Sequence, residues 1–260
     1  MSTNQIPISA AVEATPFGQR ALTLAYGLAA YASFLAALLY LVGFVAGFVV
    51  PKTVDGGAPG AGAGGVAVDL ALLALFGVQH SVMARPAFKR IFTRFVPLPA
   101  ERSTFVLASC ACLALLFWQW RPFPELVWEA RGPAAIAILL LAALGWATAL
   151  VATFLIDHFE LFGLRQTFGF ATGKAYRPPV FRERLLYRMV RHPLMLGFLI
   201  AFWAAPAMSR GHLLLAAGMT GYILLALVVE ERTLIELHGD AYRDYRRRVP
   251  KLIPRPWRRS

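Results

Sequence analysis

Charged side chains are scarce in this chain. Asp, Glu, Lys and Arg together make up 15% of its 260 residues, whereas an ordinary soluble domain carries about a quarter. Acidic residues are the rarer kind, with 14 Asp and Glu beside 26 Lys and Arg, and hydrophobic residues reach 58%. This balance excludes an ordinary soluble domain and indicates an integral membrane protein.

Cysteine is almost absent. Cys110 and Cys112 are the only two, and they stand two residues apart in an apolar run. A helix turns by about 100° per residue, so it would point them to nearly opposite sides. They offer no disulfide framework and no metal-ligand spacing. Residues 1–19 contain no basic segment and no convincing cleavage site, so we predict no signal peptide.

Long apolar runs dominate instead. A helix of about 20 residues crosses a hydrocarbon core of about 30 Å. Runs near this length cover 21–50, 66–84, 103–120, 133–156, 193–209 and 211–229. We therefore predict an all-α polytopic transmembrane helix bundle of about six helices, forming one domain over 1–260. Its four-helix part covers 21–156, and a helical hairpin with a tail covers 157–260. The short fifth run leaves open whether the hairpin spans fully.

Basic residues gather in alternate connecting segments, namely 85–102, 157–192 and the tail from Arg232 onward. The positive-inside rule places such segments on the cytoplasmic face of the membrane, so we expect both termini there. The net charge of +12 then orients the chain and attracts anionic headgroups of the lipid bilayer. Nucleic-acid binding is not predicted.

The last two apolar runs form the most informative pattern. Arg210 is the only charged residue between Pro193 and Val229, and it lies almost midway. A hairpin with Arg210 at its tip returns Arg191-His192 and Glu230-Glu231 to one membrane face. A cation, an imidazole and two carboxylates would then meet at one boundary, where lone charges are costly and mark a functional site.

The connecting segments carry weaker patterns. Gly56–Gly65 is a Gly/Ala/Pro linker, and its G-x-G-x-x-G match lacks the strand that a dinucleotide site needs. Segment 85–100 alternates basic and aromatic residues, which predicts a short interfacial helix. Segment 163–190 reads as an irregular loop, with helix resuming near Arg182.

Further ionisable residues stand at the expected cytoplasmic ends of the runs: His80, Glu101-Arg102 and Asp157-His158. Their histidines show no spacing typical of a metal site, so no metal is expected. A haem held by His80 and His158 stays an open alternative that nothing in the sequence requires.

The hairpin feet and the tail resemble a known family. Arg191-His192-Pro193-Leu194-Met195-Leu196-Gly197, Glu230-Glu231, His238-Gly239-x-x-Tyr242-x-x-Tyr245 and the Val249–Pro254 segment are similar to the cofactor-binding end of the isoprenylcysteine carboxyl methyltransferases. This resemblance implies S-adenosylmethionine as cofactor. It implies the following binding residues: Tyr187, Arg191, His192, Pro193, Gly197, Glu230, Glu231 and Tyr245.

The chemistry of the cofactor suggests how those residues would act. Its sulfonium favours aromatic faces, for which Tyr187, Tyr242, Tyr245 and Trp257 are candidates. Its ammonium would bind Glu230 or Glu231, and Arg191 would pair with its carboxylate. Tyr187 and Arg191 would share one helix face if the helix reached that far back.

Three upstream motifs indicate which class of molecule accepts the methyl group. Residues 79–85, 101–104 and 157–166 resemble the bacterial methanethiol S-methyltransferases, which implies a bacterial inner membrane, a small thiol acceptor and dimethyl sulfide as product. A thiol needs help to ionise, and the candidate catalytic residues are His80, Asp157 and His158. Arg165 and Gln166 are the candidate substrate residues.

Other functions stay open. The same upstream motifs also fit a neighbouring membrane family linked to nitrogen-oxide metabolism. The alternatives to a thiol methyltransferase are a carboxyl methyltransferase acting on a prenylated cysteine and a non-catalytic membrane protein for electron transfer.

Overall fold

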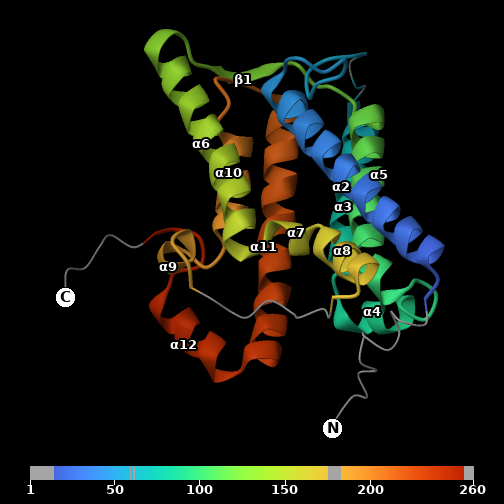
Figure 1. The fold of residues 1–260 in the computed structure, drawn as a ribbon. Coiled ribbons are helices and arrows are strands. Elements are labelled where there is room, and N and C mark those ends of the chain that lie inside the picture. Colours follow the sequence, from blue (N-terminus) through green and yellow to red (C-terminus); the bar gives the residue numbers. More distant parts are fainter. Residues whose placement is uncertain (1–14, 59, 61, 175–182, 255–260) are drawn as a thin grey trace. The chain divides into compact units, whose positions relative to one another are not determined.

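The computed structural model describes residues 15–58, 60, 62–174 and 183–254. Within them, the helices long and apolar enough to cross a membrane are α2 (Phe17–Ala46), α3 (Gly62–Met83), α5 (Leu98–Gln119), α6 (Gly132–Ile156) and α11 (Arg210–His238) (Figure 1). These helices confirm the prediction of an all-α polytopic membrane protein.

The fifth apolar run has a composite structure. Its helix, α10 (Pro193–Trp203), is only about 16 Å long at 1.5 Å per residue, or about half a hydrocarbon core. Residues 204–209 continue the chain outside any helix. They end in strand β2 (Ala207–Ser209), which pairs antiparallel with β1 (Leu126–Glu129).

The small β1–β2 sheet was not predicted. It provides hydrogen-bond partners for backbone that has left the helix. Backbone that leaves a helix in or near a bilayer must find hydrogen-bond partners within the protein. Beyond the paired strands, Ala130 N–H donates to Pro206 O at 2.7 Å and Arg210 N–H donates to Glu125 O at 2.9 Å. The Ser209 hydroxyl accepts from His212 N–H and caps α11. As predicted, Arg210 marks the start of the last long helix.

The chain forms two compact units. Within the described residues, the first unit comprises 15–39, 76–114 and 157–174, and the second comprises 40–75, 115–156 and 183–254. The division runs through α2, α3 and α5, and not only at residue 156. The single domain over 1–260 stays a prediction.

The first unit contains short helices between its long ones: α4 (Pro86–Phe92), α7 (His158–Leu161) and α8 (Leu164–Thr172). Helix α4 confirms the short helix expected in 85–100. Helix α8 shows that the irregular loop expected from residue 163 onward is wrong. Gly163 precedes α8 with φ +85°, and a Cβ there would lie 2.8 Å from the backbone nitrogen of Ser103. This glycine therefore serves a left-handed turn in close contact with α5.

The second unit contains α9 (Leu186–Met189) and α12 (Asp240–Arg248) in addition to α6, α10 and α11. The helix expected to resume near Arg182 cannot be assessed at that residue, which lies outside the described residues. Tyr242, Tyr245 and Val249 form a buried cluster with Leu234 and Ile235 of α11. This cluster holds the short tail helix against the last long helix.

Residues 62–65 of the predicted linker form the first turn of α3 rather than loop. Among the described residues no strand precedes this Gly-rich segment, which removes the structural context that a dinucleotide fingerprint requires.

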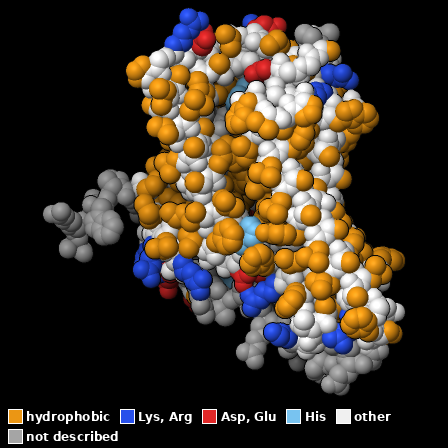
Figure 2. All heavy atoms as spheres, turned by 45° about the horizontal axis from the view of Figure 1, so that its top comes forward, with side chains coloured by type: hydrophobic (Ala, Val, Ile, Leu, Met, Phe, Trp, Pro, Cys, Tyr) orange, Lys and Arg blue, Asp and Glu red, His pale blue; other side chains and the backbone are white. Residues whose placement is uncertain are grey.

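Hydrophobic side chains cover much of the visible surface of the long helices, while Lys and Arg side chains gather towards the helix ends (Figure 2). Exposed residues of this kind on α6 include Ile136, Leu140 and Leu144. Such a surface suits lipid and not water.

Helices α6 and α10 approach each other closely through glycine. A Cβ on Gly197 would lie 2.5 Å from Ala149 N, and one on Gly145 would lie 2.7 Å from Ala201 N. Small residues at such contacts let membrane helices pack backbone to backbone. Gly197 therefore has a packing role, whatever its part in cofactor binding.

We predict that Gly197→Ala destabilises the protein by about 1–3 kcal/mol through overpacking. Thermal unfolding in detergent would measure this effect. Gly221→Ala in α11 is the matched control, since nothing lies within 4 Å of a Cβ at that position. Equal melting temperatures for the two variants would contradict the close α6–α10 contact.

Candidate functional site

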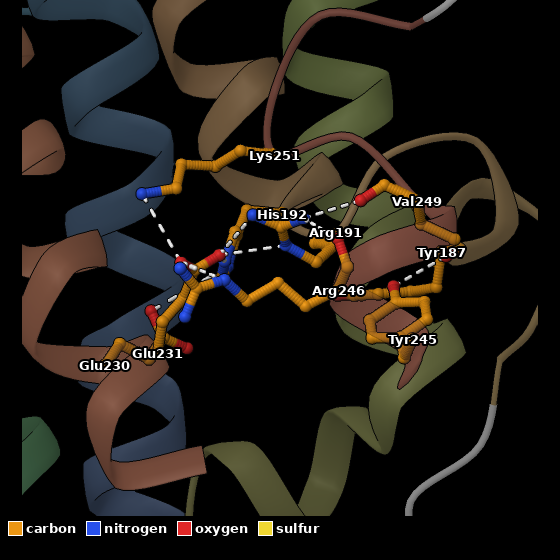
Figure 3. A network of polar contacts seen from close by, with 9 residues as sticks. All are labelled: Tyr187, Arg191, His192, Glu230, Glu231, Tyr245, Arg246, Val249 and Lys251. Atoms are coloured by element: carbon orange, nitrogen blue, oxygen red, sulfur yellow. Dashed lines mark hydrogen bonds and ion pairs between the residues drawn. The ribbon is translucent and has the colours of Figure 1, made fainter. Parts of the chain in front are cut away.

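A buried ion pair joins the two feet of the predicted hairpin. Arg191 Nη2 lies 2.7 Å from Glu231 Oε1, and the two side chains are 8% and 6% exposed. Arg191 Nε also donates to the same oxygen at 2.9 Å. The prediction that Arg191 and Glu231 meet at one boundary is confirmed (Figure 3).

Local backbone geometry positions Arg191. Helix α9 ends at Met189, and Val190 is extended with φ −141° and ψ 150°. Pro193 then begins α10, where its missing N–H costs no hydrogen bond. Tyr187 and Arg191 were expected to share one helix face only if the helix reached that far back, and this condition is not met, because the chain leaves helical geometry between them.

Glu231 is surrounded by cationic and imidazole groups. His192 Nε2 lies 3.2 Å from Glu231 Oε1, Lys251 Nζ lies 3.4 Å from Oε2, and Arg246 Nε lies 4.0 Å from Oε2. Figure 3 shows these groups directed at the carboxylate from three separate segments of the chain. Glu231 is therefore the electrostatic centre of the site.

Arg191 also fastens the C-terminal segment. Its Nη1 donates to the carbonyl oxygens of Arg246 at 2.9 Å and Val249 at 2.6 Å. Its backbone N–H donates to Pro250 O at 2.8 Å, and that of His192 donates to Lys251 O at 3.2 Å. All nitrogens of the Arg191 guanidinium thus have partners in the protein.

Glu230 differs from its neighbour in exposure. Its side chain is 43% exposed, and its Oε2 lies 4.0 Å from His192 Nδ1. Of the two adjacent carboxylates, Glu231 is committed to the protein and Glu230 faces outward. Glu230 is the one that a soluble cation can reach.

The tyrosines of the site support the tail. Tyr245 Oη donates to Tyr187 O at 2.6 Å, and Tyr242 packs edge-on against Tyr245 with ring centroids 5.7 Å apart. Burial raises the pKa of all three phenols, that of Tyr242 to about 12. Tyr242 and Tyr245 are almost fully buried, and the candidate Trp257 lies outside the described residues.

His158 lies in an aromatic enclosure of the first unit. Its Nε2 is 2.9 Å from the hydroxyl of Tyr31. The rings of Tyr31, Phe34, Phe159 and Phe162 surround it at centroid distances of 5.7, 6.1, 5.4 and 4.9 Å. Burial lowers the pKa of His158, so its neutral form dominates near pH 7.

His80 occupies a second apolar setting in the first unit. The rings of Phe76 and Phe105 lie 5.4 and 4.8 Å from its ring. Its Nδ1 lies 3.2 Å from the hydroxyl of Ser109, which donates to Phe105 O. Because that hydroxyl proton is used, Ser109 accepts from His80, which assigns the proton of a neutral His80 to Nδ1.

The other predicted residues of the first unit pair with one another. Asp157 accepts from Glu160 N–H at the start of α7 and forms an ion pair with Arg165. Gln166 Nε2 donates to Glu160 Oε1 at 2.9 Å. Asp157 therefore pairs with Arg165 of α8 and not with its neighbour His158.

Tyr31, Ser109, Arg246 and Lys251 were missed by sequence reasoning. Each belongs to a segment remote from the motif residue that it contacts. The described residues contain no group of three His, Cys, Asp or Glu that could hold a metal ion.

Comparisons with known proteins give the family. The profile described as "NnrU protein" matches residues 70–252. The methanethiol S-methyltransferase of Mycobacterium tuberculosis is 54% identical over 93% of this chain and 100% of that protein. Methanethiol S-methyltransferase 1 of Bradyrhizobium diazoefficiens is 52% identical over 90% of this chain and 82% of that protein.

A more distant match is the human protein named Nurim, which is 31% identical over 68% of this chain and 71% of that protein. No solved structure matches the chain. The matches confirm the resemblance to methanethiol S-methyltransferases that the motifs predicted.

We predict that Glu231→Ala destabilises the protein by about 3–5 kcal/mol, because it leaves the buried Arg191 without its counter-charge. Glu230→Ala should change stability far less, since its side chain is 43% exposed. Thermal unfolding in detergent without ligand would compare the two neighbours. A Glu230 variant as unstable as the Glu231 variant would show that the two roles are assigned wrongly.

Proposed function

The chain belongs to the NnrU family and is similar over most of its length to methanethiol S-methyltransferases, and we propose that it methylates methanethiol with S-adenosylmethionine. The products are dimethyl sulfide and S-adenosylhomocysteine. The observation that carries this proposal is the meeting of Arg191, His192, Glu230 and Glu231 at the feet of the hairpin.

The second unit fits the amino-acid end of such a donor. Glu230 offers a half-exposed carboxylate for the ammonium group, with His192 beside it. Arg191 and Glu231 hold this arrangement in place, because their contacts tie α10, α11 and the tail together. The bound cofactor supplies an electrophilic methyl group on a sulfonium.

The thiol must lose its proton during the transfer. Its S–H bond breaks and a bond from its sulfur to the donated methyl carbon forms. The bond from that carbon to the sulfonium sulfur breaks at the same time, so that S-adenosylhomocysteine leaves with the electron pair and the thiol proton passes to a base. We assign this base to His158, which is neutral near pH 7 and enclosed by aromatic rings that suit a small apolar thiol. A hydrogen bond between the Tyr31 hydroxyl and Nε2 holds the ring, and with Nε2–H as its donor the lone pair of the neutral ring lies on Nδ1.

The remaining candidates take supporting roles in this proposal. Asp157 and Arg165 fix the start of α7 and hence the place of His158. Gln166 braces the same turn through Glu160. His80, with its Nδ1 proton held by Ser109, is the alternative base.

The chain is an integral membrane protein by its apolar helices. We propose that it lies in the bacterial cytoplasmic membrane with both termini on the cytoplasmic side. The basic connecting segments support that orientation, and a cytoplasmic site gives access to a soluble, charged methyl donor.

We predict that the purified protein, given S-adenosylmethionine and methanethiol, releases dimethyl sulfide in step with S-adenosylhomocysteine. Glu230→Gln should weaken S-adenosylhomocysteine binding roughly tenfold or more by removing a charge-assisted contact. Glu129→Gln, a change in the exposed strand β1, is the matched control and should leave binding unchanged. Headspace chromatography and calorimetry measure the two quantities. Absence of both volatile product and cofactor binding would refute the proposal.

We predict that the acid limb of kcat/KM lies below pH 6.5, the ordinary pKa of histidine. Burial lowers the pKa of His158, so its basic form persists to lower pH and activity falls only when that pKa is crossed. His158→Asn should slow turnover roughly 100-fold or more while S-adenosylhomocysteine still binds. Glu129→Gln, in the exposed strand β1, should keep both rate and pH profile. An unchanged acid limb in the His158 variant would exclude this histidine as the base.

A further inference from the structure

Three arginines of the tail helix line a surface cavity of about 300 Å³: Arg243, Arg246 and Arg247. They stand at i, i+3 and i+4, so they share one side of α12. The buried Tyr242 and Tyr245 lie on a neighbouring side of the helix, with Tyr242 four residues before Arg246. The cavity is therefore cationic by construction, and it belongs wholly to the second unit.

The three arginines differ in their partners. Arg243 pairs with Asp240 at 2.8 Å, and Arg247 pairs with Asp244 at 3.1 Å. Among the described residues, the only carboxylate within 4.0 Å of Arg246 is Glu231. Glu231 already has closer contacts with Arg191, His192 and Lys251. Arg246 is thus a surplus cation, and its side chain is 51% exposed.

The position of Arg246 is fixed independently of its side chain. Its backbone carbonyl accepts from Arg191 Nη1 at 2.9 Å. Figure 3 shows its side chain running from α12 towards the paired carboxylates of α11. One guanidinium therefore borders both the cavity and the group of residues that receives the methyl donor.

From the sequence, Arg191 was expected to bind the carboxylate of the donor. The structure leaves that guanidinium at most one N–H to spare, and so no two-pronged fork, because Nε and one N–H of Nη2 face Glu231 and Nη1 is bound by two carbonyl groups. A carboxylate prefers a planar, accessible fork, which Arg246 provides.

We propose that Arg246 binds the carboxylate of the amino-acid end of the methyl donor, while Arg191 acts only as a positioning residue. This inference rests on the proposed function. It places the zwitterion between Arg246 and Glu230, two side chains that are each about half exposed.

The test compares two ligands that differ only in the carboxylate: S-adenosylhomocysteine and its decarboxylated analogue, S-adenosyl-3-thiopropylamine. Calorimetry on the detergent-purified full chain gives a Kd for each. The native protein should prefer S-adenosylhomocysteine. Arg246→Gln should raise its Kd roughly tenfold or more and leave the analogue within about twofold, while Arg246→Lys should retain part of the preference because it keeps the charge without the fork.

Arg247→Gln is the matched control, since it removes an arginine of the same cavity that already has a carboxylate partner. It should keep the native preference. Because Arg246 contributes its backbone carbonyl to the Arg191 contact, Arg246→Gln should melt at nearly the native temperature.

The possible results separate cleanly. An equal loss for both ligands in Arg246→Gln, or a lost preference in Arg247→Gln, overturns the assignment while the proposed function stands. A native protein that binds neither ligand overturns the proposed function and this inference together. If Arg246→Gln raises the Kd of S-adenosylhomocysteine and leaves that of the analogue unchanged, the assignment of Arg246 is supported.

Discussion

The buried pair of Arg191 and Glu231 is the constraint on which the rest of the second unit depends. The two residues are 40 positions apart, and each is less than a tenth exposed. Either charge alone would be costly to bury, and a complete pair becomes acceptable when further hydrogen bonds satisfy it. The carbonyls of Arg246 and Val249 supply those bonds, so α10, α11 and the tail must meet at this point.

This requirement means that, within one motif, some residues stabilise the fold and others remain able to bind a ligand. Adjacent Glu230 and Glu231 have side chains 43% and 6% exposed, and the two arginines that approach Glu231 differ in the same way. The buried Glu231 and Arg191 use their hydrogen-bonding groups within the protein. The half-exposed Glu230 and Arg246 keep groups that can bind a ligand. A residue type that suits a ligand is therefore no guide to its role until its other contacts are known.

The sequence predicted what the bilayer dictates. The apolar runs, the hairpin tip at Arg210 and the meeting of its feet follow from helix rise, membrane thickness and the cost of lone charges. Helix α8 was missed because its glycines were read as loop, whereas Gly163 and Gly173 take left-handed geometry at its two ends. The partners Tyr31 of His158 and Lys251 of Glu231 were missed because tertiary packing selects them. The local sequence pattern does not predict such tertiary contacts.

If His158 is the base, as proposed, its lowered pKa limits how the proton can move. A small alkyl thiol has a pKa above about 8.5, whereas that of the buried His158 lies below the ordinary value of 6.5. Full transfer to this histidine before attack would therefore be uphill by about 3 kcal/mol or more, at about 1.4 kcal/mol per pKa unit. Less than about 1% of bound thiol would stand ready as thiolate. Loss of the proton should therefore accompany formation of the carbon–sulfur bond, in which the growing positive charge on sulfur acidifies the S–H group as the base receives its proton.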